Sequence, residues 1–363
     1  MDPIAHTLVG AALAQTGLGR KTAYGTVALV LGANLPDVDG LSLLAGLDPS
    51  LLFRRGWTHG ILALALLPLV LTGLLVLWNR LKTIPSDGPP LRTGVLLGLS
   101  YFAIATHPTL DWLNNYGMRW LMPFEGRWYY GDTLFITDPW IWLMLGGAVF
   151  LFRSRRVASL AAWATLAGLW LLLLFGVPGL WPAKVLWCIG LIIFIVLRVW
   201  RVGRGERAAS RLAVGATAIV FLYIVALYGT ARYARLATEK DLADRGIQVE
   251  RIMMGPVPVT PFVKDVVAQT PEGYRYGTAR LFPRFELELA PKTLPLLEES
   301  PVVQKGIASP SVRGFMNWAR FPFADVEENS LGFTVYLLDA RYTRSRTLGF
   351  GAARVEISKD PLE

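Results

Sequence analysis

The sequence predicts a mainly α-helical protein: a polytopic membrane helix bundle followed by a C-terminal extracytoplasmic α+β domain. Of its 363 residues, 53% are hydrophobic and 17% are charged, which is too apolar for an ordinary soluble protein. Uncharged runs at 60–78, 157–183 and 212–231 are each long enough to cross a bilayer, which takes about 20 residues. From residue 232 onward the composition becomes polar, which indicates a region outside the membrane.

Eight membrane segments are expected in the first 231 residues. They span 4–17, 22–35, 59–79, 92–107, 139–152, 157–176, 183–200 and 212–231. The first, second and fifth are short for a full span, so we expect them to be tilted, re-entrant or buried by their neighbours. The predicted domains are a bundle at 1–152, additional transmembrane helices at 153–231 and a soluble α+β domain at 232–363.

The polar C-terminal region is expected to begin with a charged helix at 232–245. Alternating apolar and polar residues predict strands after it, and further helical turns are expected at 292–305 and 310–320. The strands are predicted at 247–254, 262–270, 274–281, 285–289, 331–340 and 352–358. This region contains no His and no Cys. We therefore expect it to support or cover a site formed by the bundle.

The loops between segments predict the orientation. Lys and Arg gather in every second loop, at 20–21, 80–92, 153–156 and 198–211, and such loops stay on the cytoplasmic side. The N-terminus and the C-terminal domain then face outward, with Arg54, Arg55, Arg119, Arg127 and Lys184 as exceptions to the charge rule. The net charge of +9 is thus attributed to contact with anionic membrane lipids, and nucleic acid is not expected as a partner.

The residues most able to carry chemistry are the three histidines of the chain, each at the end of an apolar segment. His107 and Asp111 are four residues apart and therefore share one face of a helix. Imidazole and carboxylate are ligands for zinc and similar divalent metals. The predicted topology places His6 and His59 on the same outer side, and ionisable groups at membrane depth are usually functional.

Asp37, Asp39, Asp111 and Asp138 belong to this outer side as well, and all but Asp111 have a simpler interpretation. Asp37 and Asp39 could form a turn, although two such close carboxylates favour a cation between them. Asp138 precedes Pro139 and could be either a helix N-cap or a ligand. Pro108 either kinks one helix or begins a new one, and both place His107 about one turn from Asp111.

Four motifs in this order resemble the YdjM-like family of bacterial inner-membrane proteins, which are regarded as metal-dependent hydrolases. They are His-Thr-Leu-Val-Gly at 6–10, Leu-Pro-Asp-Val-Asp at 35–39, Arg-Gly-Trp-Thr-His-Gly at 55–60 and His-Pro-Thr-Leu-Asp at 107–111. The resemblance covers about residues 1–150. It implies a multi-pass protein of the inner membrane, and the charge bias of the loops then places the site on the periplasmic side.

The family in turn resembles, more distantly, the zinc-dependent phospholipases C and fungal zinc nucleases. This likeness implies metal ligands at His6, Asp37 or Asp39, His59, and His107 with Asp111. Those enzymes add a further His and a His-x-x-x-Glu motif, which this chain lacks because it has no fourth histidine. The resemblance therefore implies one or two divalent ions, zinc first, with Asp138 or Asp132 as a further ligand.

The predicted function is metal-dependent hydrolysis of a phosphoester in a lipid-linked or amphiphilic substrate. A bound divalent ion supplies hydroxide at neutral pH, and Asp39 or Asp138 could take the proton. Arg54 and Arg55 could bind a phosphate of the substrate or a lipid headgroup. The alternatives are a transporter, with ligands near mid-depth, and a scaffold with a structural metal.

Overall fold

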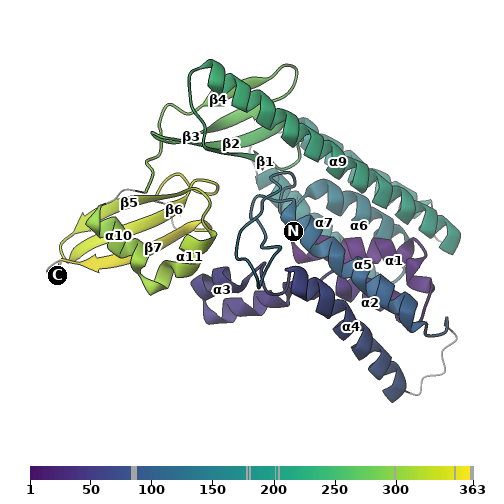
Figure 1. The fold of residues 1–363 in the computed structure, drawn as a ribbon. Helices are drawn as coiled ribbons and strands as arrows, with labels where there is room; N and C mark the ends of the chain where they lie inside the picture. Colours follow the sequence, from purple (N-terminus) through teal and green to yellow (C-terminus); the bar gives the residue numbers. More distant parts are fainter. Residues whose placement is uncertain are drawn as a thin grey trace. The chain divides into compact units, whose positions relative to one another are not determined.

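The computed structural model describes residues 1–82, 88–176, 179, 181–200, 202, 205–297, 300–346 and 349–359 (Figure 1). The chain forms two compact units. The first comprises Met1–Val38, Thr58–Tyr228 and Val257–Pro261, and the second comprises Asp39–Trp57, Gly229–Pro256 and Phe262–Glu363. The predicted division into three domains, with boundaries after 152 and 231, stays a prediction. Arg201 and Arg204 of the predicted basic loop 198–211 lie outside the described residues.

Helices occur at all eight predicted membrane segments of the first unit. They are α1 (Pro3–Gln15), α2 (Gly25–Gly32), α4 (Ile61–Leu81), α5 (Thr93–Trp112), α6 (Pro139–Arg153), α7 (Val157–Gly176), α8 (Trp181–Val199) and α9 (Glu206–Asp244). In the described chain, four of them are long and apolar enough to cross a membrane: α4, α7, α8 and α9. A fifth candidate is α2 with the 3₁₀ helix η2 (Leu35–Ala45), bent by 41°.

Eight membrane segments were predicted, of which the first, second and fifth were expected to be short for a full span. The described residues support four to five spanning helices, and the predicted segment 92–107 is not among them. α1 has 13 residues and α6 has 15, which is too short for the hydrocarbon core. α5 has 20 residues, but Ser100, His107 and Asp111 make it more polar, and these three side chains are buried among neighbouring elements. Helical periodicity in the sequence identified the helices, whereas the length and polarity of each helix decide whether it can cross the membrane.

An Asp-Pro pair begins both α1 and α6, and the pair at 138–139 confirms the predicted N-cap interpretation of Asp138. The Asp2 side chain accepts a hydrogen bond from the Ala5 backbone N–H, and Asp138 accepts from the N–H groups of Trp140 and Ile141. Proline at the first helical position loses no helical hydrogen bond, because that N–H has no partner within the helix. These caps start α1 and α6 at defined residues.

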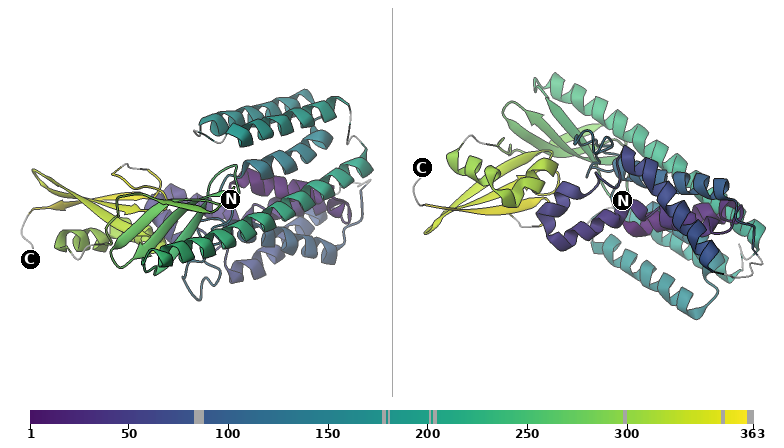
Figure 2. Two further views of the ribbon diagram at one scale, coloured as in Figure 1. Left: turned by 90° about the horizontal axis from the view of Figure 1, so that it is seen from above. Right: turned by 60° about the horizontal axis from the view of Figure 1, so that its bottom comes forward.

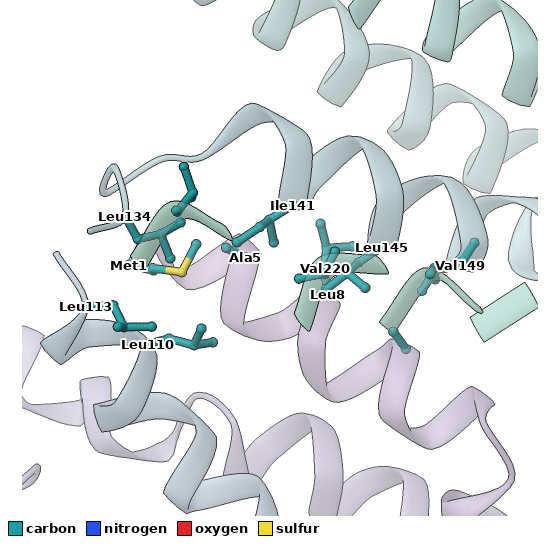
Figure 3. Close-up of a cluster of buried hydrophobic side chains, with 14 residues drawn as sticks. Met1, Ala5, Leu8, Leu110, Leu113, Leu134, Ile141, Leu145, Val149 and Val220 are labelled. Carbon is teal, nitrogen blue, oxygen red and sulfur yellow. The ribbon is translucent and has the colours of Figure 1, made fainter. Parts of the chain in front are cut away.

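The core of the first unit forms where α1, α5, α6 and α9 meet (Figure 3). Ala5 and Leu8 of α1 pack with Leu110 of α5 and with Ile141 of α6. On its other side α1 lies very close to α2, because a Cβ at Gly10 would be 2.5 Å from the Leu29 carbonyl oxygen. Gly10 is part of the first predicted motif, and its role there is this close approach. The packing holds the N-terminal turn of α1 beside α5.

The second unit contains two antiparallel sheets, which confirms the α+β prediction. The first has the order β1 (Arg251–Pro256), β2 (Val263–Thr270), β3 (Gly273–Arg280) and β4 (Glu286–Leu289), and the second has β5 (Pro322–Asn329), β6 (Gly332–Asp339) and β7 (Ala352–Ser358). Short helices α10 (Pro301–Ala308), η3 (Pro310–Val312) and α11 (Arg313–Trp318) precede the second sheet. Figure 1 shows α10 and α11 beside it.

In this unit β5 and α3 were not predicted, and one predicted helix proves to be part of a longer one. β5 begins with a proline and ends in Asp-Val-Glu-Glu-Asn, a polar edge strand that lacks strong β-formers. The charged helix expected at 232–245 is the continuation of α9, whose residues Ala234 and Leu242 pack on the first sheet. α3 (Leu47–Phe53) also belongs here, because the Asp48 carboxylate accepts hydrogen bonds from the first N–H groups of α11.

A buried ion pair stabilises the second sheet. Asp339 and Arg341 are joined at 2.8 Å with both side chains fully buried, and Asp339 also accepts from the Arg320 N–H. Asp339→Ala leaves the guanidinium buried without its carboxylate, which costs about 3–5 kcal/mol. We expect the melting temperature of the full-length protein to fall by roughly 10 °C or more.

The matched control is the exposed pair of Asp325 and Arg346 on the same sheet. Asp325→Ala should change stability by less than about 1 kcal/mol, because water screens that pair. Equal losses for the two variants would contradict the assigned role of burial.

Lys264 of β2 predicts a pH dependence of stability. Its side chain is fully buried, on the strand face that packs under α9, and its Nζ makes no hydrogen bond within the described residues. Burial lowers the pKa of Lys264 to about 8, whereas an exposed lysine titrates near 10.4. Between these values only the unfolded chain holds the proton, so stability rises with pH from about 8 to 10.

Lys264→Met should remove this rise and should raise the melting temperature at pH 7, where the native protein still carries the buried charge. The melting temperatures of both forms, measured from pH 7 to pH 10, test this. Parallel curves would show that Lys264 does not titrate in this range.

Candidate metal site

Five side chains from four parts of the first unit meet at one buried point. His6 lies in the first turns of α1, Asp37 in η2, and His59 just before Gly60, the N-cap of α4. His107 and Asp111 lie on α5, which continues through Pro108 as a single helix, so the first of the two interpretations of Pro108 is supported. The three imidazoles and Asp111 are fully buried, and the Asp37 side chain is 15% exposed.

The Asp111 carboxylate is the centre of the arrangement. One oxygen is 3.3 Å from His6 Nε2, and the other is 3.4 Å from His59 Nε2 and 3.6 Å from His107 Nε2. The same nitrogen of His107, Nε2, is also 3.6 Å from Asp37 Oδ1. The imidazoles also touch one another, since the rings of His6 and His107 stack at 3.7 Å.

These spacings fit ligands around a cation better than they fit direct hydrogen bonds. Good hydrogen bonds from nitrogen to oxygen measure roughly 2.7–3.2 Å. Two atoms bound to one tetrahedral zinc ion, at about 2.0–2.2 Å, lie about 3.3–3.6 Å from each other. Asp37, His59, His107 and Asp111 each offer a ligand atom, and these atoms lie within 4.8 Å of one another. This group could therefore hold a metal ion.

Neighbouring polar groups orient two of the imidazoles. His107 Nδ1 lies 2.7 Å from the Ala33 carbonyl oxygen, which can only accept, so Nδ1 donates to it and Nε2 is the ring nitrogen directed at Asp37 and Asp111. His59 Nδ1 lies 2.9 Å from the Thr58 hydroxyl. The two orienting groups were not predicted. Thr58 is adjacent to His59 and could have been proposed, whereas the Ala33 carbonyl carries no sequence signal.

The charge of the group also favours a cation. With neutral imidazoles the four residues carry two negative charges, and buried carboxylates are costly unless positive charge compensates them. The Met1 amino group illustrates this, because it contacts Asp111 Oδ1 within the same site. A divalent ion would balance both carboxylates at once.

Three other predicted site residues, Asp39, Asp138 and Asp132, lie outside the group of four. Asp39 belongs to the second unit, where it accepts from the Arg55 N–H at 2.8 Å and lies 3.7 Å from Arg54 Nε. Asp138 uses one oxygen to cap α6 and accepts at the other from the Tyr223 hydroxyl at 3.0 Å. Neither is in the group of four, and His6 borders that group through Asp111. Asp132, in the loop before α6, is outside it as well.

The fold and this group define a polytopic membrane protein with a buried His/Asp cluster that could bind a metal. Residues 1–177 match the model of a family described as YdjM inner membrane protein. Over these residues the chain belongs to the YdjM inner membrane protein family, as the four motifs predicted. Neither the curated proteins nor the solved structures give a match.

The metal content of the purified protein tests the site. We expect His107→Ala to lower the affinity for a divalent ion at least 10–100-fold, because it removes a ligand and the hydrogen bond to Ala33. Elemental analysis after dialysis should then find little metal.

Asp138→Asn is the control, because asparagine also caps helices and Asp138 is outside the group of four. It should keep its metal. Loss of metal in both variants would indicate general misfolding, and full retention in His107→Ala would contradict the site.

Proposed function

We propose that this protein is a membrane-bound metal-dependent hydrolase that cleaves a phosphoester in a lipid-linked or amphiphilic substrate. The observation that carries the proposal is the buried group of Asp37, His59, His107 and Asp111, with ligand-like spacing and an open side at Asp37. The match of residues 1–177 to the YdjM inner membrane protein family supports it, because the motifs of that family resemble those of metal-dependent hydrolases.

The composition of the group favours catalysis over a structural role. Structural zinc sites are usually closed and rich in cysteine, whereas this group contains carboxylates and imidazoles only. A divalent ion held there would supply a water of pKa about 7 and would polarise a phosphoryl oxygen. His107 and His59 would hold the ion, with His107 fixed by Ala33. Asp37 is the ligand that solvent reaches, so water and substrate would enter on its side.

The positions of the ligands along their helices favour hydrolysis over transport. His6 is near the start of α1, His59 precedes α4, and His107 and Asp111 are near the end of α5. Transporter sites lie instead near the middle of the membrane, at breaks in the spanning helices. Ligands at helix ends suit a substrate whose head lies at the membrane surface, which we place on the periplasmic side.

Further roles are part of the same proposal. Arg54 and Arg55 would bind a phosphate of the substrate, since guanidinium groups bind phosphate in a bidentate manner. Asp39 or Asp138 would accept the proton from the attacking water. Zinc is the first candidate ion, with one or two per chain.

Hydrolysis of defined lipids tests the function. The full-length protein is mixed with micelles containing phosphatidic acid or phosphatidylglycerol, and released phosphate or headgroup is measured. We expect turnover that a chelator abolishes and zinc restores, and that Asp37→Asn lowers by at least 100-fold because a charged ligand is lost.

Two variants refine this experiment. Arg55→Ala should raise KM more than it lowers kcat if that residue binds the phosphate. Asp138→Asn keeps the cap of α6 but cannot take a proton, so normal kcat in this variant would assign proton transfer to another carboxylate. Turnover that survives both the chelator and His107→Ala would contradict the proposal.

A further inference from the structure

An apolar cavity of about 340 Å³ lies between α6, α7 and α8 of the first unit. Its volume is in the range of about 300–1,000 Å³ that is usual for ligand pockets. Apolar side chains and glycines line it, among them Phe150, Ala167 and Phe194, and none of its described lining residues is charged. Figure 2 shows α7 and α8 running side by side beyond α6. The cavity is distinct from the metal group, to which none of its lining residues belongs.

Four tryptophans gather around one end of this cavity, and three of their indole N–H groups have an acceptor. Trp140 donates to the Val259 carbonyl oxygen at 3.1 Å, Trp142 to Asp2 Oδ2 at 3.1 Å and Trp187 to the Pro139 carbonyl oxygen at 2.9 Å. Trp170 lines the cavity, is 6% exposed, and its Nε1 has no acceptor among the described residues. A buried N–H is costly unless it is hydrogen-bonded.

The segment 257–261 bounds the cavity at this end. Val259 is 4% exposed and packs with Leu143, Trp170 and Trp187, which also line the cavity. Its φ is +65°, a left-handed conformation that a β-branched residue rarely adopts and that packing must maintain. The short connection between β1 and β2 is thus held against the tryptophan cluster.

The surroundings identify what fills such a space. α7 and α8 are both long and apolar enough to span a membrane, and only 11% of each apolar window is buried within the protein. Their remaining surface therefore meets lipid hydrocarbon, and water does not fill a cavity with apolar walls. An acyl chain suits these walls, and the ester carbonyl at its head supplies an acceptor.

We propose that this cavity binds one acyl chain of a glycerolipid, with the ester carbonyl accepting a hydrogen bond from Trp170 Nε1. Tryptophan clusters at the depth of the glycerol region are typical of membrane proteins. The occupant is an ester-linked lipid, because a plain hydrocarbon or isoprenoid chain offers no acceptor.

A further inference rests on the proposed function: the bound acyl chain belongs to the substrate itself. Trp142 lines the cavity and donates to Asp2, the N-cap of the helix that carries His6. α1 and α6 remain close further along the two helices, since a Cβ at Gly146 would be 3.7 Å from Leu8. A lipid whose chain enters the cavity has its head near the starts of α1 and α6. The substrate class is then an acylated phospholipid.

Photo-crosslinking in vesicles tests the proposal without requiring turnover. The full-length protein is reconstituted with phosphatidylglycerol that carries a diazirine in one acyl chain, and labelled peptides are identified by mass spectrometry. We expect label concentrated on α6, α7 and α8. Ala167→Phe, which fills the cavity, should lower this label at least fivefold, whereas Ala162→Phe, exposed on the same helix and outside the cavity lining, should not change it.

A second probe tests the hydrogen bond. An ether-linked phosphatidylglycerol of the same length lacks the carbonyl, so the ester-linked lipid should compete with the diazirine probe roughly fivefold better. Trp170→Phe should abolish that preference.

Label spread evenly over the lipid-facing helices, or unchanged by Ala167→Phe, would overturn the proposal and leave only general lipid contact. Equal competition by the ester and ether lipids would overturn the assigned occupant. Metal content and hydrolysis are measured separately on the same protein. Specific labelling of a protein that binds no metal would therefore contradict the proposed function alone. Metal-dependent turnover without specific labelling would contradict the proposed lipid binding in the cavity alone.

Discussion

The first unit depends on one buried carboxylate. Asp111 is fully buried, and an ionised carboxylate is tolerated there only if positive charge or hydrogen-bond donors surround it. The Met1 amino group contacts it, and three imidazoles surround it at the spacing of fellow ligands around a cation. They arrive from α1, from the residue before the α4 cap and from α5 itself. α1 reaches α5 because Gly10 lets it approach α2 closely. The helix arrangement and the candidate metal group therefore have a common physical origin.

The aspartates of the first unit have different roles because different groups surround them. Asp2 and Asp138 precede prolines and cap helices, and their oxygens are occupied by backbone N–H groups and by Trp142 or Tyr223. Asp37 and Asp111 instead face imidazole nitrogens at 3.4–3.6 Å. The neighbouring groups make the difference. A carboxylate at a helix N-terminus accepts hydrogen bonds from backbone N–H groups, whereas one placed among histidines has the surroundings of a metal ligand.

In this unit the candidate metal ligands lie at helix ends, and apolar surface runs along most of the helix bodies. An exception is the buried hydrogen bond from Thr72 of α4 to Ser100 of α5. The membrane accounts for this separation, because each polar group in hydrocarbon needs a partner inside the protein. The group of four lies in η2, just before α4 and near the end of α5, and the cavity lies along α6, α7 and α8. An amphiphilic substrate has the same division between head and chain, so the proposed function and the acyl-chain cavity complement each other.

The sequence by itself determined the helical segments, the Asp-Pro caps, the α+β class of the C-terminal region and the family, because these depend on local periodicity, composition and motif order. It also indicated His59, His107 and Asp111, since few histidines in an apolar chain stand out. Only the tertiary structure decided that Asp37 rather than Asp39 joins the group of four, that Ala33 orients His107, and that residues 39–57 belong to the second unit. These outcomes depend on contacts between residues distant in sequence, and such contacts leave no mark on local pattern.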